Sequence, residues 1–138
     1  MAAIDHVLID SNVLIDVITG DPAHFEWSAD QLVQVVESGR AAINPLIFAE
    51  VSVGFTTIEQ TEAALPRSIY RRLALPWRAA FLAGQAFATY RRRGGSRTAP
   101  LLDFYIGAHA AVAEIPLLTR DSSRFRTYFP ELRIIAPE

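Results

Sequence analysis

The stretch Val7-Leu8-Ile9-Asp10-Ser11-Asn12 is an apolar run that ends in a carboxylate, a hydroxyl and an amide. Its short length and branched residues are typical of a strand buried on both faces of a parallel sheet. Asp10 would then lie at the carboxyl end of the strand, where open α/β sheets form their ligand crevices. An equally ordinary role for Asp10 or Ser11 is to cap the following helix. A catalytic role therefore depends on whether other carboxylates reach the same edge.

Short apolar segments alternate with helical patterns along the rest of the chain. Strands are expected at 6–10, 41–43, 117–119 and 133–136, and helices at 11–17, 23–38, 46–54, 56–65, 77–93, 101–114 and 122–128. The spacing from Thr56 to Glu59 predicts a capping box at the start of the 56–65 helix. The basic segment 67–75 is expected to be a connector or a short helix. This alternation predicts βαβ units and one parallel sheet.

The composition favours one globular domain. The chain has 138 residues and is 51% hydrophobic, enough for a full core without disulfides or a structural metal. It has no cysteine, which excludes a disulfide scaffold and a Cys-based zinc site and fits a reducing compartment. The N-terminus does not resemble a signal peptide, and no segment approaches the ~20 apolar residues that a membrane helix needs. We therefore expect a cytoplasmic protein that does not associate with membranes.

The charge is distributed unevenly. The net charge is −2, but residues 1–62 carry ten acids and one base, whereas residues 63–102 carry eight arginines and no acid. Arginine side chains match phosphate geometry, and a basic band beside an acidic site would suit a phosphodiester substrate. Arg91, Arg92, Arg93 and Arg97 are the candidates for contacts with the phosphates of such a nucleic-acid substrate. The alternative is a solvated helix end whose cations complement the helix dipole.

Three further acids lie in apolar surroundings. Glu50 interrupts the apolar segment 46–51, Asp103 interrupts the segment 101–108, and Asp121 follows Leu117-Leu118-Thr119. Each has an ordinary alternative: a solvated helix stripe for Glu50, a favourable first-turn position for Asp103, and a helix cap for Asp121. Together with Asp10, however, they are placed near one edge of the expected sheet.

Four carboxylates at one edge of the sheet would need protons or cations to neutralise their charge. Like charges ~4 Å apart repel by ~4 kcal/mol at an effective dielectric constant of about 20. With oxygen ligands and no Cys or His set, the fitting cation is Mg²⁺ or Mn²⁺. Such ions activate water and hold phosphoryl oxygens during displacement at phosphorus. The pattern therefore indicates phosphodiester chemistry.

These motifs, in this order, resemble those of PIN-domain ribonucleases, and most closely the VapC-type toxins of bacterial type II toxin–antitoxin systems. The resemblance extends over the chain, although residues 56–98 match only as generic helices. The matching residues are Asp10-Ser11-Asn12, Glu50 after the helix start Asn44-Pro45, Asp103 with Ile106 and Ala108, and Thr119 and Asp121 with Phe125.

The resemblance implies one PIN-like α/β domain over residues 1–138, a three-layer fold with a parallel sheet of four or five short strands flanked by helices. It implies endonucleolytic cleavage of RNA that depends on Mg²⁺ or Mn²⁺. Asp10, Glu50, Asp103 and Asp121 would form the catalytic and metal-binding site, with Asp10 and Asp103 as direct ligands. Ser11, Asn12 and Thr119 would hold the carboxylates in place.

The resemblance also implies partners besides RNA. A cognate antitoxin protein would cover the site, and the chain would form homodimers and toxin–antitoxin hetero-oligomers. Residues 57–75 and residues 46–55 are two candidate surfaces for the antitoxin.

Three alternatives stay open. A haloacid-dehalogenase-like phosphatase also has an aspartate after its first strand, but it needs a second aspartate where this chain has Asn12, and a lysine, which this chain lacks. A non-catalytic RNA- or protein-binding module would keep the fold without cleaving RNA. A domain whose four acids are only caps and surface residues would bind no divalent ion.

Overall fold

The chain folds around a five-stranded parallel sheet with the strand order β3-β2-β1-β4-β5. The computed structural model describes residues 5–95 and 101–137. The strands are β1 (Val7–Ile9), β2 (Ala41–Ile43), β3 (Arg71–Arg72), β4 (Leu117–Leu118) and β5 (Ile134–Ile135). The predicted α/β fold with a parallel sheet is confirmed.

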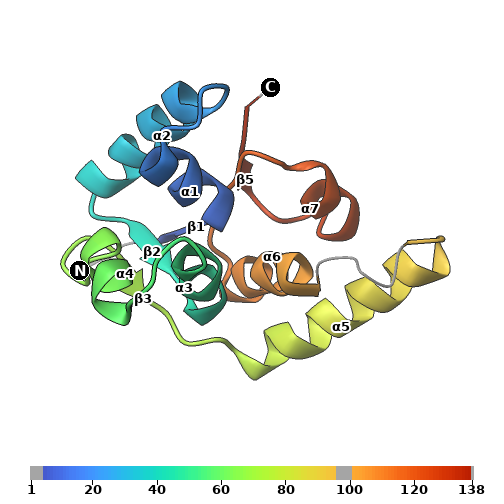
Figure 1. Ribbon diagram of the computed structural model, residues 1–138. Helices are drawn as coiled ribbons and strands as arrows, with labels where there is room; N and C mark the ends of the chain where they lie inside the picture. Colours follow the sequence, from blue (N-terminus) through green and yellow to red (C-terminus); the bar gives the residue numbers. More distant parts are fainter. Residues whose placement is uncertain (1–4, 96–100, 138) are drawn as a thin grey trace.

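Seven helices cover this sheet in the described part of the chain (Figure 1). Helices lie on both sides of the sheet in Figure 1, which makes three layers. None of them is both long and apolar enough to cross a membrane. The helices are α1 (Ser11–Thr19), α2 (Phe25–Glu37), α3 (Pro45–Ser52), α4 (Ile58–Ala64), α5 (Trp77–Arg92), α6 (Leu101–Ala113) and α7 (Ser123–Tyr128).

Strand β1 is the centre of both the sheet and the core. All three of its residues are fully buried, as an apolar strand covered on both faces must be. It pairs with β2 on one side and with β4 on the other. Because the chain leaves β1 toward β2 and returns later to β4, the strand order reverses beside β1. Such a reversal is where α/β sheets open a crevice at the carboxyl ends of their strands.

Two local expectations were wrong. The basic segment 67–75 contains strand β3, whose Arg71 and Arg72 pair with Ala42 and Ile43 of β2. Two consecutive arginines do not show the apolar pattern that predicts a strand. This segment is a strand because its backbone pairs with β2 at the edge of the sheet. The capping box of α4 is formed by Thr57 and Gln60, one residue later than predicted.

Helix α7 packs against α6 through a glycine. A Cβ at Gly107 would lie 2.8 Å from ring carbons of Phe125 and Phe129. Two aromatic rings of the 122–129 segment therefore fill the space beside Gly107. This contact sets the position of α7 beside the carboxyl ends of β1 and β4.

Candidate active site

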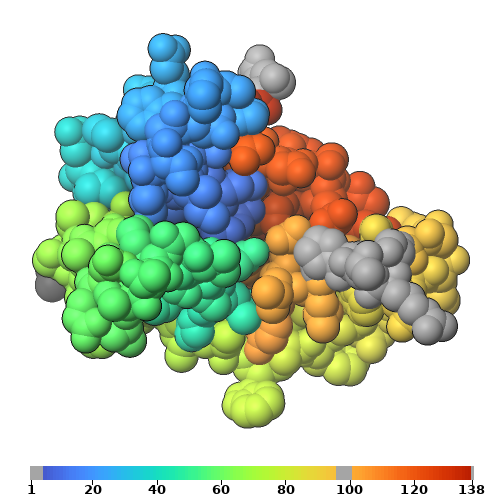
Figure 2. Space-filling model, in the orientation of Figure 1, coloured from blue at the N-terminus to red at the C-terminus, as the bar shows by residue number. Residues whose placement is uncertain are grey.

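The predicted acids surround one pocket at the carboxyl edge of the sheet. Its volume is about 280 Å³. In Figure 1, α1, α3, α6 and α7 surround this region, and in Figure 2 their surfaces meet on the face shown. The pocket is lined by Asp10, Ser11, Asn12, Glu50, Asp103, Arg120, Asp121, Arg124 and Phe125. All four acids predicted from the sequence are therefore brought together, from the end of β1, from α3, from α6 and from the loop between β4 and α7.

Asp10 is both a helix cap and a pocket residue. Its Oδ1 accepts a hydrogen bond from the Ser11 backbone N–H at 2.8 Å, and its Oδ2 accepts one from Thr119 Oγ1 at 2.8 Å. The residue is only 4% exposed. Burial, opposed by the Thr119 bond and reinforced by the charges of Asp103 and Glu50, raises the pKa of Asp10 to about 7. The Asp10 carboxylate thus caps α1 and also lines the pocket.

Thr119 connects three residues of the pocket. Besides donating to Asp10, its Oγ1 accepts hydrogen bonds from Asn12 Nδ2 at 3.3 Å and from the Asp121 backbone N–H at 3.2 Å. Asn12 Oδ1 in turn accepts a bond from the Arg120 N–H at 3.2 Å. One donated and two accepted bonds are the full capacity of a hydroxyl. This network therefore fixes the β4–α7 loop, and with it Asp121, relative to Asp10.

Glu50 reaches the pocket from α3. Helix α3 begins at Pro45, and the cap residue Asn44 accepts from the Ile47 N–H at 2.9 Å while its Nδ2 donates to His109 Nδ1 of α6 at 2.9 Å. Half-buried Glu50 accepts a hydrogen bond from Ser11 Oγ at 3.0 Å. Burial raises the pKa of Glu50, the Ser11 bond opposes this, and the charge of Asp103 adds to it. Glu50 is thus paired within the pocket rather than left on a solvated stripe.

Asp103 and Asp121 complete the set. Asp103 lies in the first turn of α6 and forms an ion pair with Arg124, whose Nη1 is 3.1 Å from Asp103 Oδ2. Burial raises the pKa of Asp103, while the Arg124 charge lowers it. Asp121 is exposed, and the N-cap of α7 is Ser122. The predicted capping alternative for Asp121 is therefore wrong.

The donor set fits a hard divalent cation. Four carboxylates, the Ser11 hydroxyl and the Asn12 amide oxygen offer only oxygen ligands to the pocket, as Mg²⁺ and Mn²⁺ prefer. Burial is the main cause that raises the pKa values of Asp10, Glu50 and Asp103, and the charges of neighbouring carboxylates add to it. A cation would relieve this mutual repulsion.

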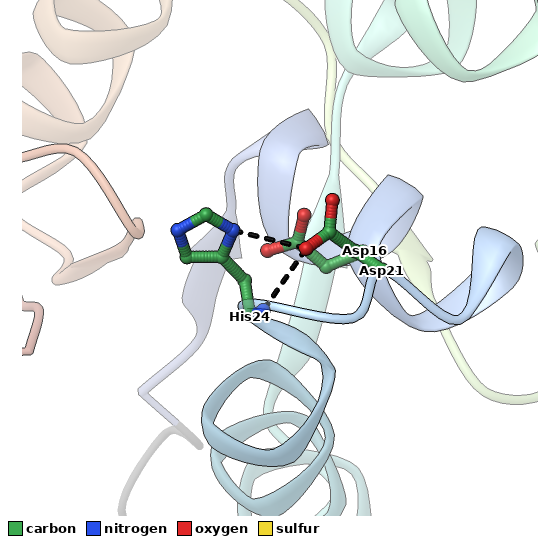
Figure 3. A group of neighbouring side chains, drawn as sticks. All are labelled: Asp16, Asp21 and His24. Atoms are coloured by element: carbon green, nitrogen blue, oxygen red, sulfur yellow. Dashed lines mark hydrogen bonds and ion pairs between the residues drawn. The ribbon is translucent and has the colours of Figure 1, made fainter.

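A tighter group of ligating atoms lies outside the pocket. Within the described residues, Asp16, Asp21 and His24 alone place three ligating atoms within 4.8 Å of one another (Figure 3). Protein donors account for this arrangement. Asp16 accepts from Ser28 Oγ at 2.7 Å and from Arg120 Nε at 2.8 Å, and Asp21 accepts from the His24 backbone and ring nitrogens. The group is therefore explained as structural, with Asp16 holding Arg120.

Sequence reasoning missed two pocket residues, Arg120 and Arg124. Their partners, Asp16 and Asp103, are far away in the sequence, so no local pattern reveals the pairs. Of the arginines predicted to contact RNA, Arg91 and Arg92 end α5 and Arg93 is its C-cap, and all three are exposed. Arg97 lies outside the described residues.

Comparison with known proteins agrees with this geometry. A chain of the DNA-bound VapBC structure from Salmonella typhimurium is similar to this chain, with a TM-score of 0.68 and 23% sequence identity. The match covers 95% of this chain and 97% of the Salmonella chain. VapBC-1 from nontypeable Haemophilus influenzae has a TM-score of 0.69 and 19% identity, with coverage of 94% and 96%. VapBC-5 of Mycobacterium tuberculosis, from the VapBC family of toxin-antitoxin systems, has a TM-score of 0.60 and 20% identity, with coverage of 96% and 97%.

The sequence matches no curated protein at a significant level. The PIN domain family model, however, matches residues 7–129, which include every acid of the pocket. The chain belongs to the PIN-domain family.

Proposed function

We propose that this PIN domain is the ribonuclease toxin of a toxin–antitoxin pair and that it hydrolyses RNA phosphodiester bonds at the acidic pocket. The observation that carries the proposal is the convergence of Asp10, Glu50, Asp103 and Asp121 beside β1. Structural likeness to VapBC toxin–antitoxin proteins supports the toxin assignment. We infer a cytoplasmic location, because the proposed substrate is RNA.

Asp10 and Asp103 would hold Mg²⁺ or Mn²⁺, with Glu50 and Asp121 completing its surroundings. Once bound, the cation supplies positive charge to phosphoryl oxygens and lowers the pKa of water. The chain's own contribution is to aim the carboxylates. Thr119 orients Asp10, and Ser11 orients Glu50, through bonds of 2.8 Å and 3.0 Å. Asp10 must give up its proton before it can bind a cation.

An antitoxin is the proposed protein partner, in a hetero-oligomer built on a homodimer of this chain. The two candidate surfaces, residues 57–75 and residues 46–55, border one hollow of about 540 Å³. Phe48 and Ile58 line it, together with Arg67 and Arg72. Arg72 is paired with Glu62, which also lines the hollow, so the hollow would accept an apolar side chain whose acidic neighbour contacts Arg67.

The alternatives are less well supported. A phosphatase of the haloacid-dehalogenase type needs a second catalytic aspartate at position 12. Asn12 instead uses its amide to join Thr119 and the Arg120 backbone, so it acts as a structural bridge. A non-catalytic binding module has no need for three acids whose pKa values are raised by burial, because such groups destabilise the ionised pocket.

The test is incubation of a total-RNA preparation with the purified protein in Mg²⁺ or Mn²⁺, with EDTA as control. We expect a small number of discrete fragments that disappear when EDTA is added, and sequencing of their ends would identify the target. Intact RNA in both metals, from folded protein that also binds no Mn²⁺ in calorimetry, would contradict the proposal. Mn²⁺ binding without cleavage would instead support the non-catalytic module.

A further inference from the structure

Arg124 is a cation inside an otherwise acidic pocket. Two arginines line this pocket, and they differ in how they are held. Arg120 uses Nε and Nη2 to bind Asp16, at 2.8 Å and 3.2 Å, so its planar edge is taken by a carboxylate. Arg124 makes one hydrogen bond within the described residues, from Nη1 to Asp103 Oδ2 at 3.1 Å. Most of the N–H groups of Arg124 thus have no hydrogen-bond partner among the residues that the structure describes.

Aromatic rings hold the Arg124 guanidinium in place. Its Cζ atom lies 5.5 Å from the Tyr90 ring centre and 5.8 Å from that of Phe104. These rings also contact Tyr128, with ring centres 6.1 Å and 5.1 Å away. A guanidinium above aromatic faces keeps its N–H edge free for bidentate contacts with an anion. Arg124 is therefore positioned without being saturated.

The same aromatic group carries arginines from the end of α5. Arg93 lies over Tyr128, with Cζ 5.5 Å from the ring centre, and Arg91 lies over Phe87 at 5.9 Å. Phe87 contacts both Tyr90 and Phe104. One aromatic cluster of α5, α6 and α7 thus joins the exposed arginines to the acidic pocket. Of the three arginines that lie over this aromatic cluster, Arg124 is the one that contacts a carboxylate of the pocket.

We propose that Arg124 binds an RNA phosphate beside the acidic cluster, a substrate-binding role that rests on the proposed nuclease function. If its only role were to neutralise Asp103, the guanidinium would compete with the cation that Asp103 is expected to hold. Only Nη1 bonds Asp103, so the other N–H groups of the guanidinium, which is held by Tyr90 and Phe104, would contact the phosphate with or without a cation.

The test compares Arg124→Gln and Arg124→Lys with a matched control, Arg126→Gln. Arg126 lies on the same helix and is exposed, and within the described residues its side chain hydrogen-bonds only to Ser122. Binding of a fluorescein-labelled single-stranded RNA of mixed sequence is followed in EDTA by fluorescence anisotropy at several salt concentrations. Losing one phosphate contact should reduce the slope of log K against log salt by about 0.7 in Arg124→Gln. Arg126→Gln should keep the wild-type slope.

Two further readouts separate binding from a structural role. Single-turnover cleavage in Mg²⁺ should fall about 10- to 100-fold in Arg124→Gln, as expected for a lost bond to a charged group. Arg124→Lys should keep the salt slope but recover only part of the rate, because lysine lacks the fork. Mn²⁺ affinity measured by calorimetry should stay equal or increase in Arg124→Gln, because a competitor for Asp103 is gone.

The outcomes distinguish the two proposals. Wild-type protein that cleaves no RNA and binds no Mn²⁺ would overturn the proposed function itself. Active wild type together with an Arg124→Gln variant of unchanged salt slope and unchanged cleavage rate would overturn only the role of Arg124. Loss of Mn²⁺ affinity in a folded Arg124→Gln variant would likewise contradict it, because it would show that Arg124 supports the metal site instead.

Discussion

At the scale of single residues, Asp10 shows how one side chain can serve both the fold and the site. One of its oxygens caps α1 and the other accepts the Thr119 hydroxyl. The raised pKa of Asp10 has a consequence for stability. The folded protein holds the Asp10 proton more tightly than the unfolded chain does. The stability that this proton contributes is therefore full below about pH 4 and is lost as the pH rises to about 7.

The first prediction concerns this pH window. Between about pH 4 and 7 the metal-free protein should lose on the order of 4 kcal/mol of unfolding free energy through Asp10. Asp10→Asn, which carries no charge, should show a flatter dependence and exceed the wild type in stability at pH 8. Urea unfolding in EDTA across this range provides the measurement. If the unfolding free energies of the two proteins changed with pH in the same way, the raised pKa of Asp10 would be contradicted.

The second prediction concerns Thr119. Thr119→Val keeps the shape of the side chain but removes the hydroxyl that joins Asp10, Asn12 and the Asp121 backbone. Mn²⁺ affinity, measured by calorimetry, should fall about 10- to 100-fold, as is usual when a group that orients metal ligands is lost. Thr119→Ser keeps the hydroxyl and serves as the control. Equal affinities in the valine and serine variants would show that the hydroxyl has no such role.

At the scale of elements, the contact between α6 and α7 fixes the pocket wall that carries Arg124 and Phe125. The third prediction is that Gly107→Ala lowers the unfolding free energy by about 1 kcal/mol. Overpacking against Phe125 and Phe129 should cost about 1–3 kcal/mol, and the gain in helix propensity should offset about 1 kcal/mol of it. Chemical denaturation measures this loss.

Gly84→Ala is a matched control for this prediction. Gly84 lies inside α5, and a Cβ there would meet nothing within 4 Å. The substitution should therefore stabilise the protein by about 0.5–1 kcal/mol. Stabilisation by both substitutions would mean that α7 moves freely away from Gly107.

Most elements were predictable because their signals are local. Asn44-Pro45 gives the start of α3, and Gly20 in the left-handed conformation (φ 64°) ends α1. The acids of the pocket were also predictable, because Asp10 and Asp121 follow apolar strands whose carboxyl ends share one edge. Strand β3 and the pairing of Arg124 with Asp103 were not, because both depend on contacts between distant parts of the chain.

At the scale of the whole molecule, the uneven charge distribution becomes a surface beside the pocket. The fourth prediction is that replacing Arg91, Arg92 and Arg93 together with glutamine weakens RNA binding. The slope of log K against log salt should fall by about 0.7 for each phosphate contact that is lost. Arg78→Gln is the control, because Arg78 is exposed near the other end of α5. Unchanged binding by the triple variant would confine the RNA contacts to the pocket.

The central claim is that the four carboxylates form one metal-dependent site for RNA cleavage. Its most direct test is cleavage of total RNA in Mn²⁺ by wild-type protein, Asp10→Asn and the control Asp30→Asn, whose carboxylate is exposed on α2 and contacts Gln34. We expect discrete fragments from the wild type and Asp30→Asn, no fragments in EDTA, and a loss of cleavage in folded Asp10→Asn. Full cleavage by Asp10→Asn, or by the wild type in EDTA, would contradict the account.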